Sequence, residues 1–272
     1  MIETRGSRPE AATAPGRDSA SAHAAGRGQT FDPRTASLKA EDRRLLALVD
    51  AALERARASA GTHLVCQSGC TPCCFGPFAI TQLDAWRLRE GLRALAVTEP
   101  GRAAGVHERA AAAVARQAPA FGPGQGGVFA TEAEEERFYE TFASDPCPAI
   151  DPDSGACTLY AWRPVACRTY GPPVRMHGDD LPPCPLCFKR AAREEIEAAR
   201  QTIEAGHVQA PLTDRVERET GRRGMTTIAF AIAGAPTDGH DANPPSTRAA
   251  PARATPGSRC TATPPTPVIA PP

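Results

Sequence analysis

The clearest pattern of apolar and polar positions lies over residues Ala40 to Ala60. Leu45, Val49 and Leu53 recur at helical spacing, whereas charged residues such as Arg44 fall on the opposite side. An apolar stripe with a period of 3.6 residues is typical of a helix that packs on a core with one face. The pattern therefore predicts a long amphipathic helix before the first cysteine.

Two capping signals predict the start of further helices. Thr81 followed by Asp84 resembles an N-cap pair and predicts a helix to about Leu95. Residues 131–134 read T-E-A-E, which is a full capping box, and they predict a short helix to about Ala143. In both cases a side-chain oxygen can accept a hydrogen bond from a free N–H group of the first helical turn.

Weaker patterns complete the set of expected elements. Helices are predicted over 103–117, 188–205 and 213–222, with one strand over 226–232. The segment GPGQGG at 122–127 is expected to form a loop, because glycine and proline interrupt regular structure. The expected fold class is thus mostly α, with long irregular cysteine-rich metal-binding loops, in a single small domain with disordered tails.

Composition places the irregular residues at the two ends of the chain. Glycine (23) and proline (28) make up nearly a fifth of the 272 residues, above the usual share of roughly 12%. Residues 1–35 and 234–272 lack apolar periodicity and are expected to be disordered tails. The cysteine-cluster metal-binding domain is then expected over 36–233.

Charge and hydropathy exclude several classes of partner. Lys+Arg and Asp+Glu both number 31, and aromatic residues make up 5% of the chain. This balance favours neither a nucleic-acid partner nor a membrane surface. The first residues lack the apolar run of a signal peptide, and the longest apolar stretch, Met225 to Ala235, is too short to span a bilayer. We therefore expect a cytoplasmic protein, whose cysteines stay reduced.

Ten cysteines dominate the candidate chemistry, and four of them lie within nine residues. Cys66, Cys70, Cys73 and Cys74 occupy a segment with Gly and Pro, which can wrap around an ion. The side chains of adjacent residues diverge in extended backbone, so Cys73 and Cys74 are expected to strain a single small site. The sequence leaves two alternatives: two metal centres, or one ligand beside a packed or bridging thiol.

A second group of thiols follows about seventy residues later. Cys147, Cys157 and Cys167 recur at intervals of ten residues, and Asp-Ser-Gly at 153–155 predicts a turn between the first two. The pair Cys184-Pro-Leu-Cys187 precedes the helix expected from 188, whose first amides would favour a thiolate. Buried structural cysteines do not require such spacing, so the pattern indicates metal ligation. Cys260 lies in the expected C-terminal tail as a free thiol.

The sequence C-x2-G-C-x2-CC, followed by CPxxDxxSGxCxLYxxRPxxCRxYG, resembles the YkgJ-type cysteine-cluster family (CxxCxxCC type) over about residues 63–190. That family is described as a zinc- or iron-chelating domain and is often labelled iron–sulfur-containing. The resemblance implies that the metal ligands are Cys66, Cys70, Cys73, Cys74, Cys147, Cys157 and Cys167, with Cys184 or Cys187 as the last.

All-thiolate ligation suits both zinc and iron–sulfur clusters. The family label and the spread of the cysteines favour an iron–sulfur cluster, of the 4Fe-4S kind, with zinc or iron ions as the alternative. Arg163 and Arg168 flank Cys167. They either lower the pKa of nearby thiols or form ordinary surface salt bridges.

Other candidate residues are weaker. His63 is expected to be an exposed loop histidine rather than a ligand, given the surplus of thiols. Tyr160, Trp162 and Tyr170 are expected to pack in a local core. No nucleotide-binding loop or hydrolase motif occurs, so no catalytic residue is assigned.

The sequence therefore favours a metal-binding protein of unknown cellular role over an enzyme. The first alternative is a metal- or cluster-assisted protein-modifying enzyme such as a methyltransferase, since a related cysteine cluster occurs in flagellin lysine methylases. A zinc-stapled interaction module is the third hypothesis. The sequence names no protein partner.

Overall fold

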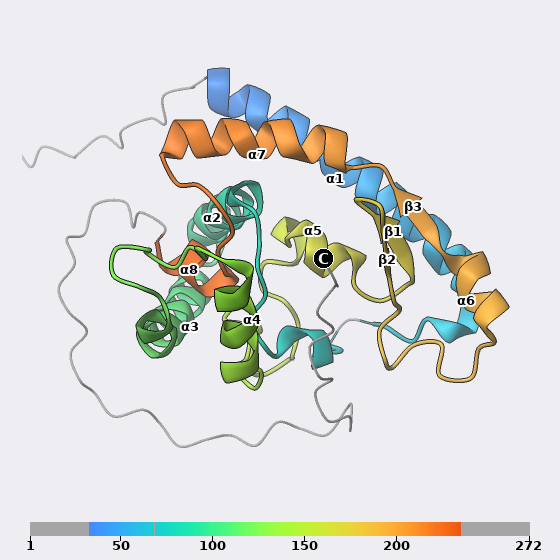
Figure 1. Cartoon of the computed structure of the whole chain (residues 1–272). Coiled ribbons are helices and arrows are strands. Elements are labelled where there is room, and N and C mark those ends of the chain that lie inside the picture. The colour runs from blue at the N-terminus through green and yellow to red at the C-terminus, as the bar shows by residue number, and fades with distance from the viewer. Residues whose placement is uncertain (1–32, 68, 235–272) are drawn as a thin grey trace, which may run out of the picture.

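The computed structural model describes residues 33–67 and 69–234, which form a mostly helical fold, as predicted (Figure 1). The elements, with η marking 3-10 helices, are α1 (Pro33–Ala60), η1 (Gly61–His63), η2 (Pro72–Cys74), α2 (Gln82–Thr98), α3 (Pro100–Gln117), η3 (Ala118–Ala120), α4 (Glu132–Thr141), η4 (Tyr160–Trp162), α5 (Val165–Thr169), β1 (Val174–Met176), β2 (Asp179–Leu181), α6 (Arg193–Ala199), β3 (Gln201–Ile203), α7 (Gly206–Thr220) and α8 (Ile228–Ala233).

Helix α1 runs along one side of the molecule, with α7 beside one end and the small sheet and α6 beside the other (Figure 1). Its predicted apolar stripe is confirmed, since Leu45, Val49 and Leu53 are all buried. They pack with Leu212 and Val216 of α7 in a group that we call the second core. The helix is longer than predicted, and it begins three residues before the expected domain boundary.

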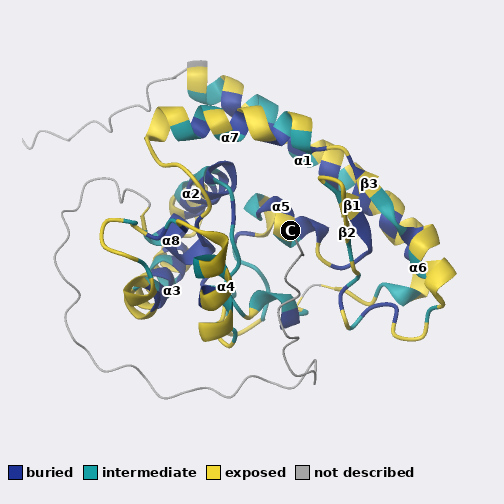
Figure 2. Cartoon of the chain, viewed as in Figure 1, coloured by how far each residue is buried: buried dark blue, intermediate teal, exposed yellow. Residues whose placement is uncertain are grey.

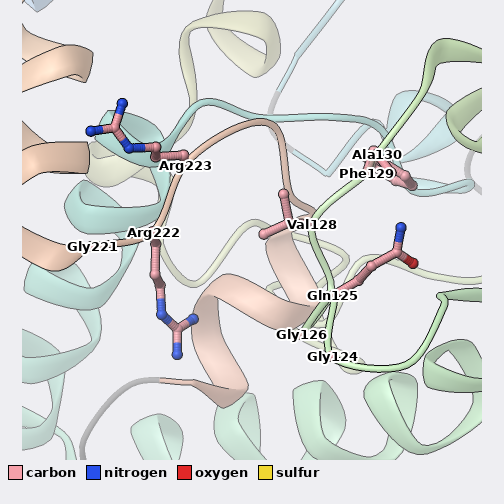
Figure 3. Close-up of a pocket in the computed structure, with 9 residues that line it drawn as sticks. All are labelled: Gly124, Gln125, Gly126, Val128, Phe129, Ala130, Gly221, Arg222 and Arg223. Atoms are coloured by element: carbon pink, nitrogen blue, oxygen red, sulfur yellow. The ribbon is translucent and has the colours of Figure 1, made fainter.

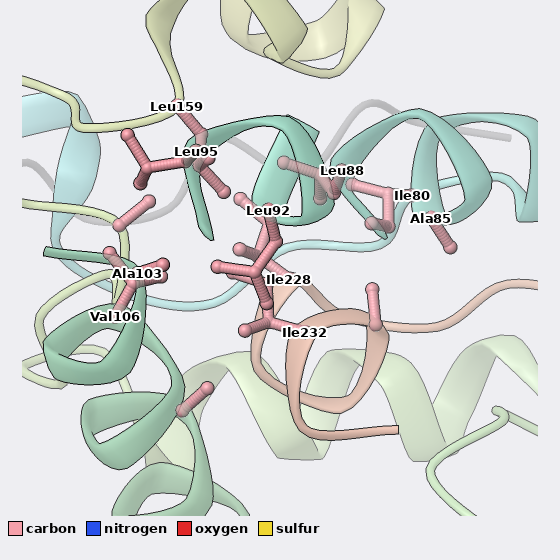
Figure 4. Packing of buried hydrophobic residues seen from close by; sticks show 13 residues of the cluster. Ile80, Ala85, Leu88, Leu92, Leu95, Ala103, Val106, Leu159, Ile228 and Ile232 are labelled. Carbon is pink, nitrogen blue, oxygen red and sulfur yellow. The ribbon is translucent and has the colours of Figure 1, made fainter. Parts of the chain in front are cut away.

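Helices α2, α3 and α8 pack together on the other side of the molecule. Figure 2 shows that the buried surfaces of α2 and α8 face each other, whereas α6 is mostly exposed. Their side chains supply most of the first core, which Figure 4 shows from close by. Its buried members are Ile80, Ala85, Leu88, Leu92, Leu95, Ala103, Val106, Ala110, Ala149, Leu159, Ile228, Ala231 and Ile232.

Both predicted capping signals are confirmed. The Thr81 hydroxyl accepts a hydrogen bond from the Asp84 N–H at the start of α2, and Thr131 does the same for Glu134 at the start of α4. Only Glu99 separates α2 from α3, and Pro100 is the first residue of α3. Proline fits the first helical position because the N–H that it lacks would have no partner inside the helix.

The helix predicted over 188–205 is wrong for most of its length. Phe188 has a φ of 55°, in the left-handed region, and the chain makes turns before α6 begins at Arg193. After α6, the main chain leaves the helix and pairs in parallel with β1 as strand β3. Pairing with β1 therefore outweighs the helical pattern of residues 201–203. Helix α7, in contrast, exceeds the predicted 213–222 at its start and accommodates Pro211.

The strand predicted over 226–232 is also wrong, because Ile228 to Ala233 form helix α8. Only Thr226 keeps extended pairing, in isolated bridges with Ile80 and Val128. All of α8 except its last residue is buried, so tertiary packing overrides the strand preference of its β-branched residues.

The small sheet has the order β2-β1-β3 and was not predicted from the sequence. Its hairpin turns at His177 and Gly178, which both have positive φ. Each strand has only three residues, too short for an alternating pattern to stand out.

Most of the two predicted tails, together with Cys260, lies outside the described residues. In the part of the chain that the structure describes, none of the helices combines the length and the apolar character that crossing a membrane requires.

Candidate functional site

The first cysteine segment follows α1 and forms irregular chain that tightens into η2. Cys66 and Cys70 lie in the irregular part, and Cys73 and Cys74 lie in η2, which Pro72 begins. The Sγ atoms of Cys73 and Cys74 are 4.0 Å apart. The expectation that these two side chains diverge is therefore wrong, because it assumed extended backbone and the chain here is a 3-10 helix.

Main-chain hydrogen bonds join this segment to the second one. The N–H of Cys147 donates to the carbonyl of Cys74 at 2.8 Å, and Phe75 forms an antiparallel bridge with Pro146. A second bond, from the Gly76 N–H to the carbonyl of Asp145, extends the pairing. Two cysteines that are 73 positions apart in the sequence are thus held side by side by their own backbones.

Cys157 is brought back toward Cys147 by the predicted turn, which is confirmed. The Asp151 carboxylate accepts hydrogen bonds from the N–H groups of Asp153 and Ser154 and from the Ser154 hydroxyl, and these bonds lower the pKa of Asp151. Ile150 and Cys157 form a bridge across the turn.

Cys167 lies in the short helix α5, which is anchored at both ends. The Val165 N–H donates to the buried Asp84 carboxylate of α2 at 3.1 Å. Arg168 binds Asp50 of α1 at 2.8 Å. Since α5 has only five residues, these contacts with α1 and α2 fix its position more than its own hydrogen bonds do.

The two arginines that flank Cys167 have different roles. The Arg163 guanidinium lies 3.5 Å from the centroid of the Tyr160 ring, and its positive charge lowers the pKa of Cys157 and Cys167 against the larger opposing effect of burial. Arg168 is instead buried in its ion pair with Asp50. Arg163 therefore lowers the pKa of nearby thiols, as one interpretation of the sequence expects. Arg168 forms a salt bridge, as the other expects, but its side chain is buried and not at the surface.

Cys184 and Cys187 lie in a turn, so the expected helix N-terminus beside them is wrong. The Cys187 N–H donates to the Cys184 carbonyl at 2.8 Å. Hydrogen bonds from the Cys187 thiol, from nearby main-chain N–H groups and from the Tyr170 hydroxyl lower the pKa of Cys184 to about 6. Main-chain N–H groups of Val65 and Cys66 point to the Cys187 sulfur, which places this turn beside the first segment.

Cys73 lies close enough to four other cysteines for a charge on it to affect their pKa values. Its own thiol pKa is raised, first by its hydrogen bond with Cys74 and then by burial. Burial is also the largest cause of a raised thiol pKa at four other positions, and the charge of a Cys73 thiolate raises each of them further: Cys66, Cys147 (to about 12), Cys157 and Cys167. Thiols from all the cysteine segments therefore act on one another in one region.

The sulfurs nevertheless do not meet at a point. Within residues 33–67 and 69–234, no three His, Cys, Asp or Glu side chains form an arrangement that could hold a metal ion. Cys147, Cys157 and Cys167 pack against the first core. Cys184 and Cys187 belong to a third core that also contains Ala60, Phe188 and Ala199. The structure thus gathers the predicted ligands without closing a coordination sphere.

His63 is not the exposed loop histidine that the sequence predicts. It is half-buried, its ring stacks on Phe188 at 5.6 Å, and its Nε2 lies 3.5 Å from Glu195. Of the three aromatic residues expected in a local core, Trp162 packs against the first core, but Tyr160 and Tyr170 are exposed.

A cavity of about 440 Å³ lies between the glycine-rich loop and the turn after α7 (Figure 3). No signal in the sequence predicted it. Neither a cysteine nor an acidic residue lines it; its walls are Gly124, Gln125, Gly126, Val128, Phe129, Ala130, Gly221, Arg222 and Arg223.

None of the known family models matches this chain, and neither a curated protein nor a solved structure is detectably similar to it.

Proposed function

We propose that this protein binds metal through its clustered cysteines, as an iron–sulfur cluster, with zinc or iron ions as the alternative. The observation that carries the proposal is the gathering of separate cysteine segments around Cys73. The proposal also follows the resemblance of residues 63–190 to the YkgJ-type family. Thiolates are the preferred ligands of zinc and of iron–sulfur clusters.

The donor set of the region fits such a group. Its thiols are reduced in the structure, and they include an adjacent pair and a C-x2-C pair. Burial makes most of these thiols hold their protons, since it raises the pKa of the four thiols that Cys73 affects. When bound, a metal would take the place of those protons and supply the positive charge that several neighbouring thiolates need.

Several groups around the thiols would help to hold that charge. The Arg163 guanidinium lowers the pKa of nearby thiols, and the main-chain N–H groups of Val65 and Cys66 point to the sulfur of Cys187. Tyr170 donates to Cys184. Hydrogen bonds to ligating sulfurs stabilise thiolates and tune the metal. Because the sulfurs do not already converge, we expect metal binding to be coupled to local ordering of the segments.

The test is metal analysis of the full chain, purified without oxygen, together with its visible absorption spectrum. An iron–sulfur cluster would give iron and acid-labile sulfide in equal amounts and broad visible absorption, whereas zinc would give metal without colour. The variant Cys73→Ser should lose most of the metal, and Cys260→Ser should keep it. Wild-type protein without iron or zinc after anaerobic reconstitution would overturn the proposal.

A further inference from the structure

Arg89 is a buried cation without a counter-ion. It lies on α2 with 7% of its surface exposed, and no hydrogen bond or ion pair joins it to any residue of 33–67 or 69–234. The one carboxylate that favours its charged form is Glu90. Glu90 is already engaged, because it binds Lys39 at 2.5 Å and also binds Arg93.

A second arginine lies close to Arg89 and adds positive charge. Burial is the largest cause that lowers the pKa of Arg89, to about 10, and the charge of Arg222 is the next. Figure 3 shows the Arg222 guanidinium directed toward α8, while Arg223 points the opposite way. At the end of α8, a Cβ added to Gly234 would lie 3.2 Å from Nη1 of Arg222. Arg222 has no carboxylate partner in the described part of the chain either.

The neighbouring Arg87 is also buried, but carboxylates of the same fold neutralise its charge. Arg87 lies two residues earlier on the same helix and is 2% exposed. It binds Asp42 and Asp84, both at 2.5 Å. Burying a charge without such partners is strongly unfavourable, and a nearby like charge adds to the cost. Arg89 therefore lacks the internal partner that the fold supplies to Arg87, and the exposed Arg222 adds a second positive charge near it.

We propose that Arg89 and Arg222 together bind an oxyanion, a phosphate or a carboxylate, beside the C-terminal end of α8. Guanidinium groups bind both anions through paired, charge-assisted hydrogen bonds. The partial negative charge at the end of the six-residue α8 is much smaller than two full positive charges. The proposal is independent of the metal function, because no cysteine takes part in this site.

The anion has two possible sources with the same chemistry. One is a free phosphate or a phosphate-bearing small molecule. The other is this chain, whose first carboxylates after Gly234 are Asp238 and Asp241.

The experiment titrates inorganic phosphate into the full chain by calorimetry, with chloride adjusted to keep the ionic strength constant. If the anion is free, wild type binds one phosphate, and its Tm rises by about 5 °C or more at a hundredfold excess over Kd. Arg89→Gln and Arg222→Gln should each raise Kd at least tenfold. The matched controls are Arg93→Gln, on the same helix but bound to Glu90, and Arg223→Gln, whose side chain points away; both should change Kd less than twofold.

If the chain supplies the anion, wild type binds no phosphate, the double variant Asp238→Asn/Asp241→Asn binds it, and adding Arg89→Gln abolishes that binding. The inference is overturned if neither wild type nor the double variant binds phosphate, or if binding survives Arg89→Gln and Arg222→Gln. Arg89→Gln removes an uncompensated buried charge, so it should fold, which circular dichroism would check. Arg222 is exposed, and its variant carries the test alone if Arg89→Gln does not fold.

Discussion

The buried guanidinium of Arg87 connects three parts of the molecule. It binds Asp42 of α1 through two nitrogens, at 2.8 and 2.5 Å, and Asp84 of its own helix at 2.5 Å. Asp84 in turn accepts the Val165 N–H at the start of α5. The sequence could not reveal this arrangement, because Asp42 is 45 positions from Arg87 and each charge alone resembles an ordinary surface residue of an amphipathic helix.

Replacing Arg87 with methionine should therefore destabilise the protein strongly. The change leaves Asp42 and Asp84 buried without their partner, and removing one member of a buried ion pair costs about 3–5 kcal/mol. Urea unfolding would measure the loss. Arg55→Met is the matched control, because Arg55 lies on exposed α1 surface with a single hydrogen bond to Gln201, and it should change stability by less than about 0.5 kcal/mol. Similar losses for the two variants would contradict the assigned role.

Tyr139 should make stability fall at alkaline pH. Its hydroxyl donates to Glu135 and accepts from the Ala79 N–H. Burial first, and then the Glu135 carboxylate, raise the pKa of Tyr139 above its ordinary value of 10. A raised folded-state pKa means that the stabilisation is complete below pH 10 and is lost as pH rises above it, at up to about 1.4 kcal/mol per pH unit. The drop between pH 9 and pH 11 should be smaller in Tyr139→Phe. Equal drops would show that Tyr139 ionises normally in the folded protein.

The adjacent cysteines should differ in their effect on metal content, although their sulfurs are only 4.0 Å apart. A thiolate at Cys73 would raise the pKa of Cys66 and of all three cysteines of the second group, so Cys73→Ser removes the common neighbour of both segments. We expect Cys73→Ser to lose most of the metal. Cys74→Ser should retain an altered but occupied site. Metal content and absorption spectra of the two anaerobic variants provide the measurement; identical partial losses would mean that the pair acts as one unit.

At the scale of elements, the sequence predicts best where the signal is local. The caps of α2 and α4 are set by a hydroxyl and an N–H three residues apart, and both were predicted correctly. Residues 188–205 and 226–232 failed for the opposite reason. Their structure depends on partners that are distant in the sequence. Residues 201–203 pair with β1 as strand β3, and residues 228–233 form helix α8, which is buried against α2 and α3. The three-residue strands depend entirely on such partners.

The packing of α2 on η4 gives a prediction at this scale. Gly91 is buried in α2, and a Cβ there would lie 2.4 Å from Cγ of Trp162. Gly91→Ala should therefore destabilise the protein by about 1–3 kcal/mol, despite the better helix propensity of alanine. In Gly105→Ala, on α3, the new Cβ meets only the flexible end of Arg109 at 3.3 Å, so stability should stay the same or rise by up to about 1 kcal/mol. Thermal unfolding of both variants tests the contact; a stabilised Gly91→Ala would rule it out.

At the scale of the whole molecule, the identity of the candidate ligands could be predicted, but their arrangement could not. The nine cysteines from position 66 to position 187 are candidates because they cluster in the sequence and include two C-x2-C pairs, which can bring sulfurs within reach of one ion. What joins the segments is main-chain pairing, such as the bond from the Cys147 N–H to the Cys74 carbonyl, and this has no signature in the side chains. The split of the cysteines between the first and third cores likewise depends on how the helices pack.

Between α4 and α6, the chain contains only elements of three to five residues. Such short elements are marginal alone, so we expect bound metal to order this part of the molecule. Anaerobic removal of metal with an excess of chelator should lower Tm and expose residues 145–187 to limited proteolysis. Helix α1 provides the internal control, because its 28 residues pack in the second core and its cleavage should not change. Cys73→Ser serves as the second control: if it binds no metal, the chelator should leave its Tm and its cleavage pattern unaltered. Unchanged Tm and unchanged cleavage of 145–187 in metal-free wild type would mean that the cores and the main-chain pairing hold the cysteine segments without metal.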